Sequence, residues 1–246
     1  MAEWIYGRRT VAEHLAAAPG TCLKLVVAQG RRLPPDLEDA ARAAGVCAEE
    51  LAPAALDRLA EGGNHQGVCL RVGGWGYVSL EDLLARLVGH PFPLLLALDQ
   101  VQDPHNLGAV LRVADGVGAV GVILPKDRAA GLGAAAARTA AGAAATVPVA
   151  QVVNLARSLD ACAAAGCAVV GAAGEGSVSL YDCPVHLPAV LVLGSEHRGI
   201  RPNVAKRCRT LVSLPMAGQV GSLNVAVACG VIAYELRRRQ PAPGAG

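Results

Sequence analysis

Three polar, glycine-containing segments each follow an apolar run with the character of a buried strand. They span residues 99–108, 194–199 and 215–222. Ligands of open α/β sheets bind beyond the carboxyl ends of the strands. Amide, carboxylate, hydroxyl and guanidinium groups at such ends can bind and orient a polar substrate. The sequence therefore predicts one site assembled from three segments.

The first segment carries Asn106, with Arg112 six residues later and the small residues Gly108 and Ala109 between them. Small residues allow another backbone or a ligand to approach closely. Six residues are not quite two helical turns, so Arg112 reaches back to the loop only with a suitable rotamer. The structural alternative is that Asn106 caps a helix and Arg112 pairs with a carboxylate.

The second and third segments carry Glu196, between Gly194 and Gly199, and then Ser222 and Asn224. A glycine-flanked carboxylate is common in turns, but this one comes directly after an expected strand. Ser222 and Asn224 precede the last expected helix, where both residue types are good caps and exposed amides suit a polar ligand. Capping alone explains the serine well and the asparagine less well.

Alternation of apolar strands with helices predicts an α/β fold with a mostly parallel sheet. The expected strands of this sheet are 94–98, 120–124, 146–149, 168–172, 189–193 and 210–214, with helices at 107–117 and 223–238. A smaller α/β unit precedes them, with strands at 23–28 and 68–72, a strand opening at 46–47, and helices at 36–44 and 53–60. We expect domains at 1–72 and 92–240, a linker at 73–91 and a disordered tail at 241–246.

Composition narrows the class of protein. The chain is 53% hydrophobic and 17% charged, with a net charge of +2, which is too small to indicate a nucleic-acid binder by itself. The 8 cysteines form no CxxC pair and no tight group with histidine, so we expect reduced thiols and no metal site. No signal segment and no apolar run of about 20 residues is seen, which favours a cytoplasmic protein without a membrane partner.

Taken together, the three segments resemble the signatures of the SpoU (TrmH-like) family of SPOUT methyltransferases. The matching strings are Asn106…Gly108-Ala109…Arg112, Gly194…Glu196…Gly199 and Ser222-Leu223-Asn224-Val225. Further strings are similar to the bacterial subgroup that methylates a guanosine of 23S (large-subunit) ribosomal RNA: Ile5-Tyr6-Gly7, His65-Gln66-Gly67-Val68, Pro125-Lys-Asp-Arg128 and Pro215-Met-Ala-Gly218. The resemblance spans nearly the whole chain.

This resemblance implies a SPOUT-type parallel sheet with a C-terminal trefoil knot, which periodicity alone does not indicate. It implies an N-terminal RNA-binding domain like ribosomal protein L30e. It also implies a homodimer whose active site is completed across the interface, with contacts from the last helix and the helix that carries Arg112. The activity implied is methylation of an RNA ribose 2′-oxygen with S-adenosylmethionine.

The same resemblance assigns roles to residues. The catalytic group would be Asn106, Arg112, Glu196, Ser222 and Asn224. The cofactor would contact Ala173, Leu193, Gly194, Ser195, Glu196, Leu214, Met216, Ser222 and Leu223, mainly through their backbone groups. RNA would contact Arg8, Arg9, Asn64, His65, Gln66 and Arg201. Because arginine stays protonated, we assign Arg112 to phosphate binding and to stabilisation of developing negative charge. Ala226 and the pair His197-Arg198 depart from the family pattern.

Three other functions are considered. The first is methylation of transfer RNA by the same chemistry. The second is a non-catalytic RNA-binding or ribosome assembly factor, which the presence of Asn106, Arg112 and Glu196 disfavours. The third is a Rossmann-type oxidoreductase, which would need GxGxxG after an early strand, and the isolated Gly174-Glu-Gly176 does not supply it.

Overall fold

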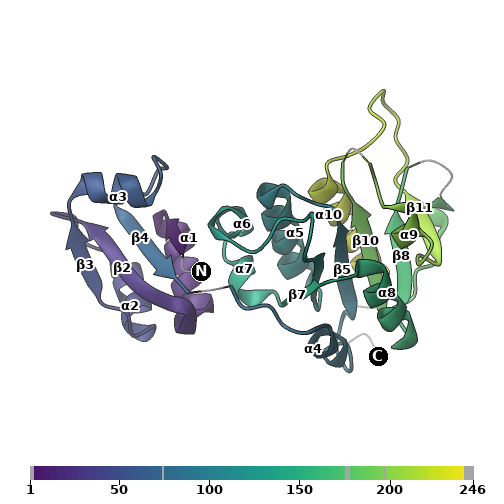
Figure 1. Ribbon diagram of the computed structural model, residues 1–246, viewed down its shortest axis with the longest axis horizontal. Helices are drawn as coiled ribbons and strands as arrows, with labels where there is room; N and C mark the ends of the chain where they lie inside the picture. The colour runs from purple at the N-terminus through teal and green to yellow at the C-terminus, as the bar shows by residue number, and fades with distance from the viewer. Residues whose placement is uncertain (1–2, 74, 175–177, 197, 241–246) are drawn as a thin grey trace. The chain divides into compact units, whose positions relative to one another are not determined.

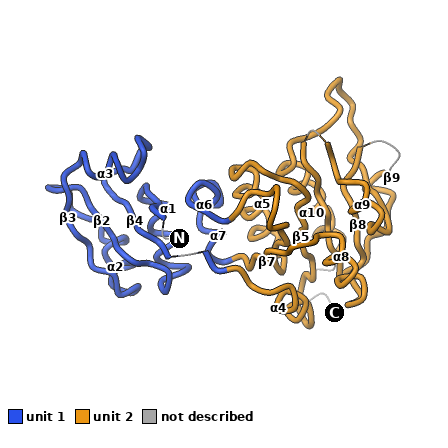
Figure 2. The backbone as a smooth tube through the Cα atoms, in the orientation of Figure 1, with its two compact units in different colours: residues 1–76, 132–146 blue, residues 77–131, 147–246 orange. Residues whose placement is uncertain are grey.

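The computed structural model describes residues 3–73, 75–174, 178–196 and 198–240. The chain divides into two compact units, one of residues 1–76 and 132–146 and one of residues 77–131 and 147–246 (Figure 2). Residues 132–146 thus leave the second unit and pack with the first, although the sequence assigns them to the second domain. The tail predicted at 241–246 lies outside the described residues, as do His197 and Gly176.

The first unit contains a four-stranded sheet of order β1-β4-β2-β3, in which β4 is antiparallel to β1 and β2 while β2 and β3 are parallel. Its elements are β1 (Glu3–Tyr6), α1 (Arg8–Ala17), η1 (Pro19–Thr21), β2 (Cys22–Ala28), α2 (Pro35–Ala43), β3 (Ala48–Leu51), α3 (Pro53–Leu59), β4 (Val68–Val72), α6 (Ala134–Ala140) and α7 (Ala143–Thr146). The Glu3 carboxylate accepts a hydrogen bond from Ala134 N at the start of α6. The guanidinium of Arg138 lies 4.7 Å from the centre of the Tyr6 ring. These contacts attach the inserted residues to the first unit.

The second unit contains a seven-stranded sheet of order β7-β6-β5-β10-β8-β11-β9, in which every pairing is parallel. Its elements are α4 (Leu80–Ala85), β5 (Leu94–Asp99), α5 (Pro104–Val117), β6 (Gly121–Pro125), β7 (Val149–Val152), α8 (Leu155–Ala164), β8 (Ala168–Ala172), β9 (Val178–Ser179), η2 (Leu180–Asp182), β10 (Ala189–Gly194), α9 (Pro202–Ala205), β11 (Thr210–Ser213) and α10 (Val225–Arg238). The prediction of an α/β fold with a parallel sheet is confirmed.

Helices cover both faces of this sheet (Figure 1). Leu95 and Ala97 of β5 and Val190 and Val192 of β10 pack in one apolar cluster with residues of α4, α8 and α9. Because successive side chains of a strand point to opposite faces, the alternate residues of β5 and β10 face α5 and α10. All six residues of β5 are buried. Burial on both faces explains why these strands are continuous apolar runs.

One strand prediction is wrong. Residues 146–149 do not form a strand, because the alanine-rich segment Ala143–Thr146 is helical and the strand begins only at Val149, after a proline. Alanine has the highest helix propensity, which explains why this segment is helical and the strand begins later than predicted. The helix predicted from 107 begins at Pro104, and the one predicted from 223 begins at Val225. Within the described parts of the chain, no helix is long and apolar enough to cross a membrane.

The burial of the central strands predicts that two valine substitutions have very different effects on the free energy of unfolding. Val190 is fully buried in β10, whereas Val153, just after β7, is 82% exposed. We expect Val190→Ala to lower the free energy of unfolding by about 2 kcal/mol, because it removes buried apolar surface and leaves a cavity. Val153→Ala should change it by less than about 0.5 kcal/mol. Urea unfolding followed by circular dichroism measures both, and equal effects would contradict the layered core described above.

Candidate functional site

Glu196 joins the three segments that the sequence singles out. It lies in the loop after β10, and its Oε1 accepts hydrogen bonds from Asn106 Nδ2 at 2.9 Å and from Asn224 Nδ2 at 2.5 Å. Asn224 Nδ2 also donates to Asn106 Oδ1 at 2.8 Å. Residues far apart in the sequence therefore form one network beyond the carboxyl ends of β5 and β10.

Asn106 belongs to the network because another residue caps its helix. Asp103 is the N-cap of α5, and its Oδ1 accepts a hydrogen bond from His105 N at 2.9 Å, while Pro104 occupies the first helical position. Asn106 thus lies in the first helical turn with its side chain directed to Glu196. The alternative that Asn106 caps the helix is wrong.

Asn224 has two roles in the structure. Its Oδ1 accepts from Ala226 N at 2.9 Å and from Val227 N at 3.3 Å, which caps α10, while its Nδ2 donates to Glu196 and Asn106. Ser222 lies in the preceding loop and is not the cap. The interpretation that capping explains the serine better than the asparagine is therefore wrong.

The loop that carries Glu196 is a tight turn. Ser195 N donates to Gly199 O at 3.2 Å, and Gly199 N donates to Ser195 O at 2.8 Å. Gly199 has a φ of +62°, in the left-handed region that favours glycine. A Cβ added to Gly194 would collide with the backbone of Gly199 and Ile200. Both glycines of this motif are therefore required by the turn itself.

A buried ion pair fixes the far end of this loop. Asp99, the last residue of β5, is fully buried, and its Oδ1 accepts from Arg201 Nε at 2.8 Å and contacts Arg201 Nη2 at 2.7 Å. Its Oδ2 accepts from Arg201 N at 2.8 Å. Asp99 begins the first of the three predicted segments but was not predicted as a site residue. Its sequence position alone does not indicate that it pairs with Arg201. Contact of Arg201 with RNA stays a prediction, and two of its side-chain nitrogens are held by Asp99.

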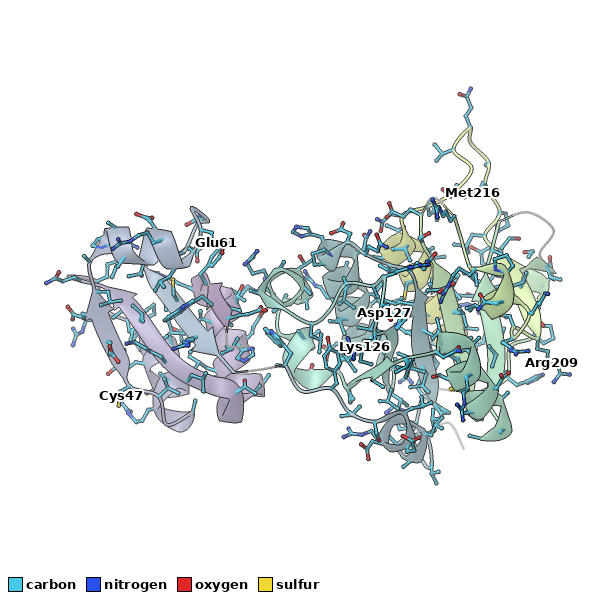
Figure 3. All side chains as sticks on the ribbon, in the orientation of Figure 1. Cys47, Glu61, Lys126, Asp127, Arg209 and Met216 are labelled. Carbon is cyan, nitrogen blue, oxygen red and sulfur yellow. The ribbon has the colours of Figure 1, made fainter. Side chains whose placement is uncertain are left out.

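All nine residues predicted to contact a cofactor line one cavity of about 240 Å³. Its wall consists of small and apolar residues from the ends of β8, β10 and β11, the loop before α10, and α10 itself. Met216, labelled in Figure 3, lies in the loop between β11 and α10. An adjoining space of about 390 Å³ is lined by Glu196, Ser222, Leu223 and Asn224.

A second, more polar cavity of about 730 Å³ lies beside the network and includes Asn106 and Glu196 in its wall. Gln100, Asp103, Arg128 and Arg198 also line it, and none of them was predicted as a site residue. Arg128 ends the string Pro125-Lys-Asp-Arg128, which resembles the subgroup that methylates 23S ribosomal RNA. That resemblance is the sequence feature that could have identified Arg128 as a site residue. Its neighbours Lys126 and Asp127 are labelled in Figure 3.

Arg112 is the predicted catalytic residue that the chain does not bring to the others. It lies on α5, is exposed, and is absent from the walls of the cavities described above. Six residues along a helix turn a side chain by about 120° away from Asn106 and advance it by about 9 Å. Asn106, Glu196 and Asn224 therefore form a cluster that Arg112 of the same chain does not complete.

Four of the five residues of the first unit that are predicted to contact RNA form hydrogen bonds within that unit, and Asn64 stays a prediction. Arg8 N donates to Gln66 Oε1 at 3.0 Å, and Arg9 pairs with Glu13 at 2.8 Å. His65 Nδ1 accepts from Gly67 N, so its Nε2 carries the proton and donates to Asp57 at 3.1 Å. Arg8 and Gln66 line one small pocket with Arg31 and Arg32. This pocket is a compact group of basic and amide side chains.

Two cysteines of the second unit have shifted thiol pKa values. Burial raises the pKa of Cys208 to about 11 and that of Cys229 to about 12, so both thiols are protonated at neutral pH. Among the described residues, no group of three or more His, Cys, Asp or Glu side chains is placed to hold a metal ion.

Two family models match the chain. The model described as "SpoU rRNA Methylase family" matches residues 93–234, and the model described as "RNA 2'-O ribose methyltransferase substrate binding" matches residues 4–74. The first match contains Asn106, Glu196 and Asn224, and the second contains the pocket with Arg8 and Gln66.

Curated proteins and solved structures are similar over almost the whole length. The chain is 43% identical to the 23S rRNA (guanosine-2'-O-)-methyltransferase RlmB of Vibrio cholerae, with 98% of each chain covered. It is 44% identical to the protein of the same name from Pseudomonas aeruginosa, with 98% of this chain and 99% of that one covered. A solved AdoMet-bound rRNA methyltransferase from Sinorhizobium meliloti has a TM-score of 0.79 at 28% identity and covers 98% of this chain and 88% of its own.

The Asp99–Arg201 pair predicts a strong dependence of stability on one carboxylate. We expect Asp99→Ala to lower the free energy of unfolding by about 3–5 kcal/mol, because it leaves a partly buried guanidinium without its partner. The matched control is Asp160→Ala, since Asp160 pairs with Arg207 at 3.1 Å but both side chains are about half exposed. The control should change stability by less than about 1 kcal/mol. Thermal unfolding of both variants checks this, and a mild effect of Asp99→Ala would contradict a fixed loop.

Proposed function

Because this chain belongs to the SpoU rRNA methylase family, we propose that it transfers the methyl group of S-adenosylmethionine to a ribose 2′-oxygen, at a guanosine of 23S ribosomal RNA. The observation that carries this proposal is the Asn106–Glu196–Asn224 network, which lies between an apolar cavity and a polar one. Methyl transfer needs a donor and an attacking hydroxyl aligned on two sides of one point. The network lies at such a point.

The residues of the apolar cavity fit this cofactor. The adenine ring and the hydrocarbon parts of methionine suit a wall of Leu193, Leu214 and Ile232, while backbone amides before α10 suit polar ends. Ala173, Gly174 and Gly221 leave room where larger side chains would fill the cavity. When bound, S-adenosylmethionine supplies an electrophilic methyl group on a sulfonium, so no metal ion is needed for activation.

The network would orient the ribose. Both asparagine amides hold Glu196 Oε1, so the direction of Oε2 is fixed and this oxygen can accept a hydrogen bond from the 2′-hydroxyl. Asn106 and Asn224 are in turn fixed at the starts of two helices, α5 and α10. Such preorganisation aligns the attacking oxygen before the reaction and lowers the entropic cost of the step. The hydroxyl proton would leave to RNA phosphate or water.

We also propose a homodimer in which the partner subunit's Arg112 completes each site. Arg112 of the same chain is exposed on α5 and does not reach the cavities. Beside α5, helix α10 exposes Val227, Val231 and Tyr234 along one side, at the spacing of a helical face. Exposed apolar residues on a well-packed helix pair suit an isologous interface with a second copy. The second Arg112 would stabilise the charge that develops on the ribose oxygen.

The first unit would select the RNA, with Arg8 and Gln66 in its basic pocket as contacts to phosphate or sugar. The trefoil knot stays a proposal as well. It is supported by the resemblance to the SPOUT methyltransferases alone. A cytoplasmic location fits the proposed substrate and the eight free thiols.

The substrate can be tested by mapping 2′-O-methyl groups in total RNA from cells with and without this protein. We expect one methylated guanosine of 23S ribosomal RNA to be lost in the deletion and restored by the wild-type gene but not by Glu196→Ala. Loss of a mark in transfer RNA would replace the proposed substrate by the alternative one. An unchanged pattern in both RNAs would favour a non-catalytic RNA-binding protein.

The shared site predicts complementation between two inactive variants. Arg112→Ala and Glu196→Ala should each reduce methyl transfer by about 100-fold or more, since each removes a group that acts in the transition state. Co-expressed with different tags and purified as a heterodimer, they should recover up to half of wild-type activity, because one site then has both residues. The doubly substituted chain paired with wild type gives no intact site and is the control. No recovery in the mixed dimer would contradict the contribution of Arg112 across the interface.

A further inference from the structure

The polar cavity of about 730 Å³ shares a wall with the apolar cavity. Ser195, Glu196 and Val225 line both. Two ligands bound in the two cavities would therefore meet at Glu196, the carboxylate that Asn106 and Asn224 hold. The volume of the polar cavity lies within the range of small-molecule sites, about 300–1,000 Å³.

Two arginines give this cavity its cationic groups. Arg128 comes from the loop after β6 and Arg198 from the loop after β10, and both are exposed. In the described part of the chain, neither guanidinium forms an ion pair with a carboxylate. The two carboxylates of the cavity are already engaged, Asp103 as the cap of α5 and Glu196 in its network. The arginines are thus available to an anionic ligand.

The backbone that presents these groups is in an uncommon conformation. Gln100 has a φ of +61° and Arg128 a φ of +57°, in the left-handed region that non-glycine residues rarely adopt. Ala130 N donates to Val101 O at 2.8 Å, which joins the two loops that carry them. Strained residues of this kind concentrate at ligand sites, where the surrounding structure holds them. Two such residues in the wall of one cavity indicate a binding function.

We propose that this cavity binds the target nucleotide, and that Arg128 and Arg198 bind the phosphates on either side of the methylated ribose. The inference rests on the proposed function and adds to it the residues of the chain that hold the substrate. Arginine forks match phosphate oxygens in geometry and charge. RNA presents its 2′-hydroxyls and phosphates along the same backbone, so phosphate contacts from two arginines can position a ribose beside Glu196.

The test uses the full-length protein and an unmodified fragment of 23S ribosomal RNA. We expect Arg128→Ala and Arg198→Ala each to raise the KM for RNA about tenfold, with the Kd for S-adenosylmethionine unchanged. RNA binding measured from low to high salt should lose about one counterion per substituted arginine, which flattens the salt dependence. Arg209→Ala is the matched control, since Arg209 is exposed at the amino end of β11 and is labelled in Figure 3 far from Arg128's neighbours Lys126 and Asp127.

The outcomes separate this inference from the proposed function. If the wild type methylates the RNA but both variants keep their KM and salt dependence, the cavity does not bind phosphate and the inference is overturned. Weaker binding of S-adenosylmethionine in the variants, with RNA affinity unchanged, would also overturn it. A wild type that transfers no methyl group refutes the proposed function, and the RNA-binding measurement then still decides whether the two arginines bind RNA.

Discussion

The hydrogen bonds from Asn106 and Asn224 to Glu196 are the interaction on which the site depends, because they join three segments that meet only in the folded chain. Each partner is fixed independently. Asp103 sets the start of α5, Asn224 sets the start of α10, and the Ser195–Gly199 turn sets the direction of Glu196. The amides of Asn106 and Asn224 orient the Glu196 carboxylate, and the starts of α5 and α10 fix the two asparagines. The side chains of the network are therefore oriented before a substrate binds.

The parallel sheet explains why this network forms where it does. Strands β5 and β10 are hydrogen-bonded neighbours in register, from Leu94 opposite Ala189 to Asp99 opposite Gly194. The residues that follow each strand therefore emerge side by side. Asp99 uses this proximity to bind Arg201, which fixes the loop after β10 at a second place. The buried carboxylate of Asp99, at the carboxyl end of β5, thus fixes the loop after β10.

The two cavities differ in the polarity of their lining residues, and each therefore suits a different kind of ligand. The smaller one is lined largely by apolar side chains and glycines, which suits a ligand held by shape and backbone groups. The larger one presents arginines, amides and carboxylates, which suits a charged polymer. The two cavities share a wall at Ser195, Glu196 and Val225, where the proposed donor and acceptor would meet. Arg112 is exposed, and α10 has an exposed apolar side. In the proposed homodimer, the Arg112 guanidinium of one subunit would therefore complete the Asn106–Glu196–Asn224 site of the other.

Local sequence determined the family and most strands of the larger sheet, while the strand predicted at 146–149 and the helix starts predicted at 107 and 223 differ from the structure. Continuous apolar runs are typical of strands buried on both faces, and the three motifs, which lie within the range that the SpoU family model matches, are short enough to be recognised directly. The nine residues assigned to a cofactor were found in one cavity because loops after parallel strands converge. Tertiary structure alone decided the rest. Three features depend on neighbours that are distant in the chain. They are the Asp99–Arg201 pair, the left-handed backbone of Gln100 and Arg128, and the double role of Asn224, which caps α10 and donates a hydrogen bond to Glu196. Residues 132–146, an alanine-rich stretch without a strong pattern, pack with the first unit because their partners Glu3 and Tyr6 lie there.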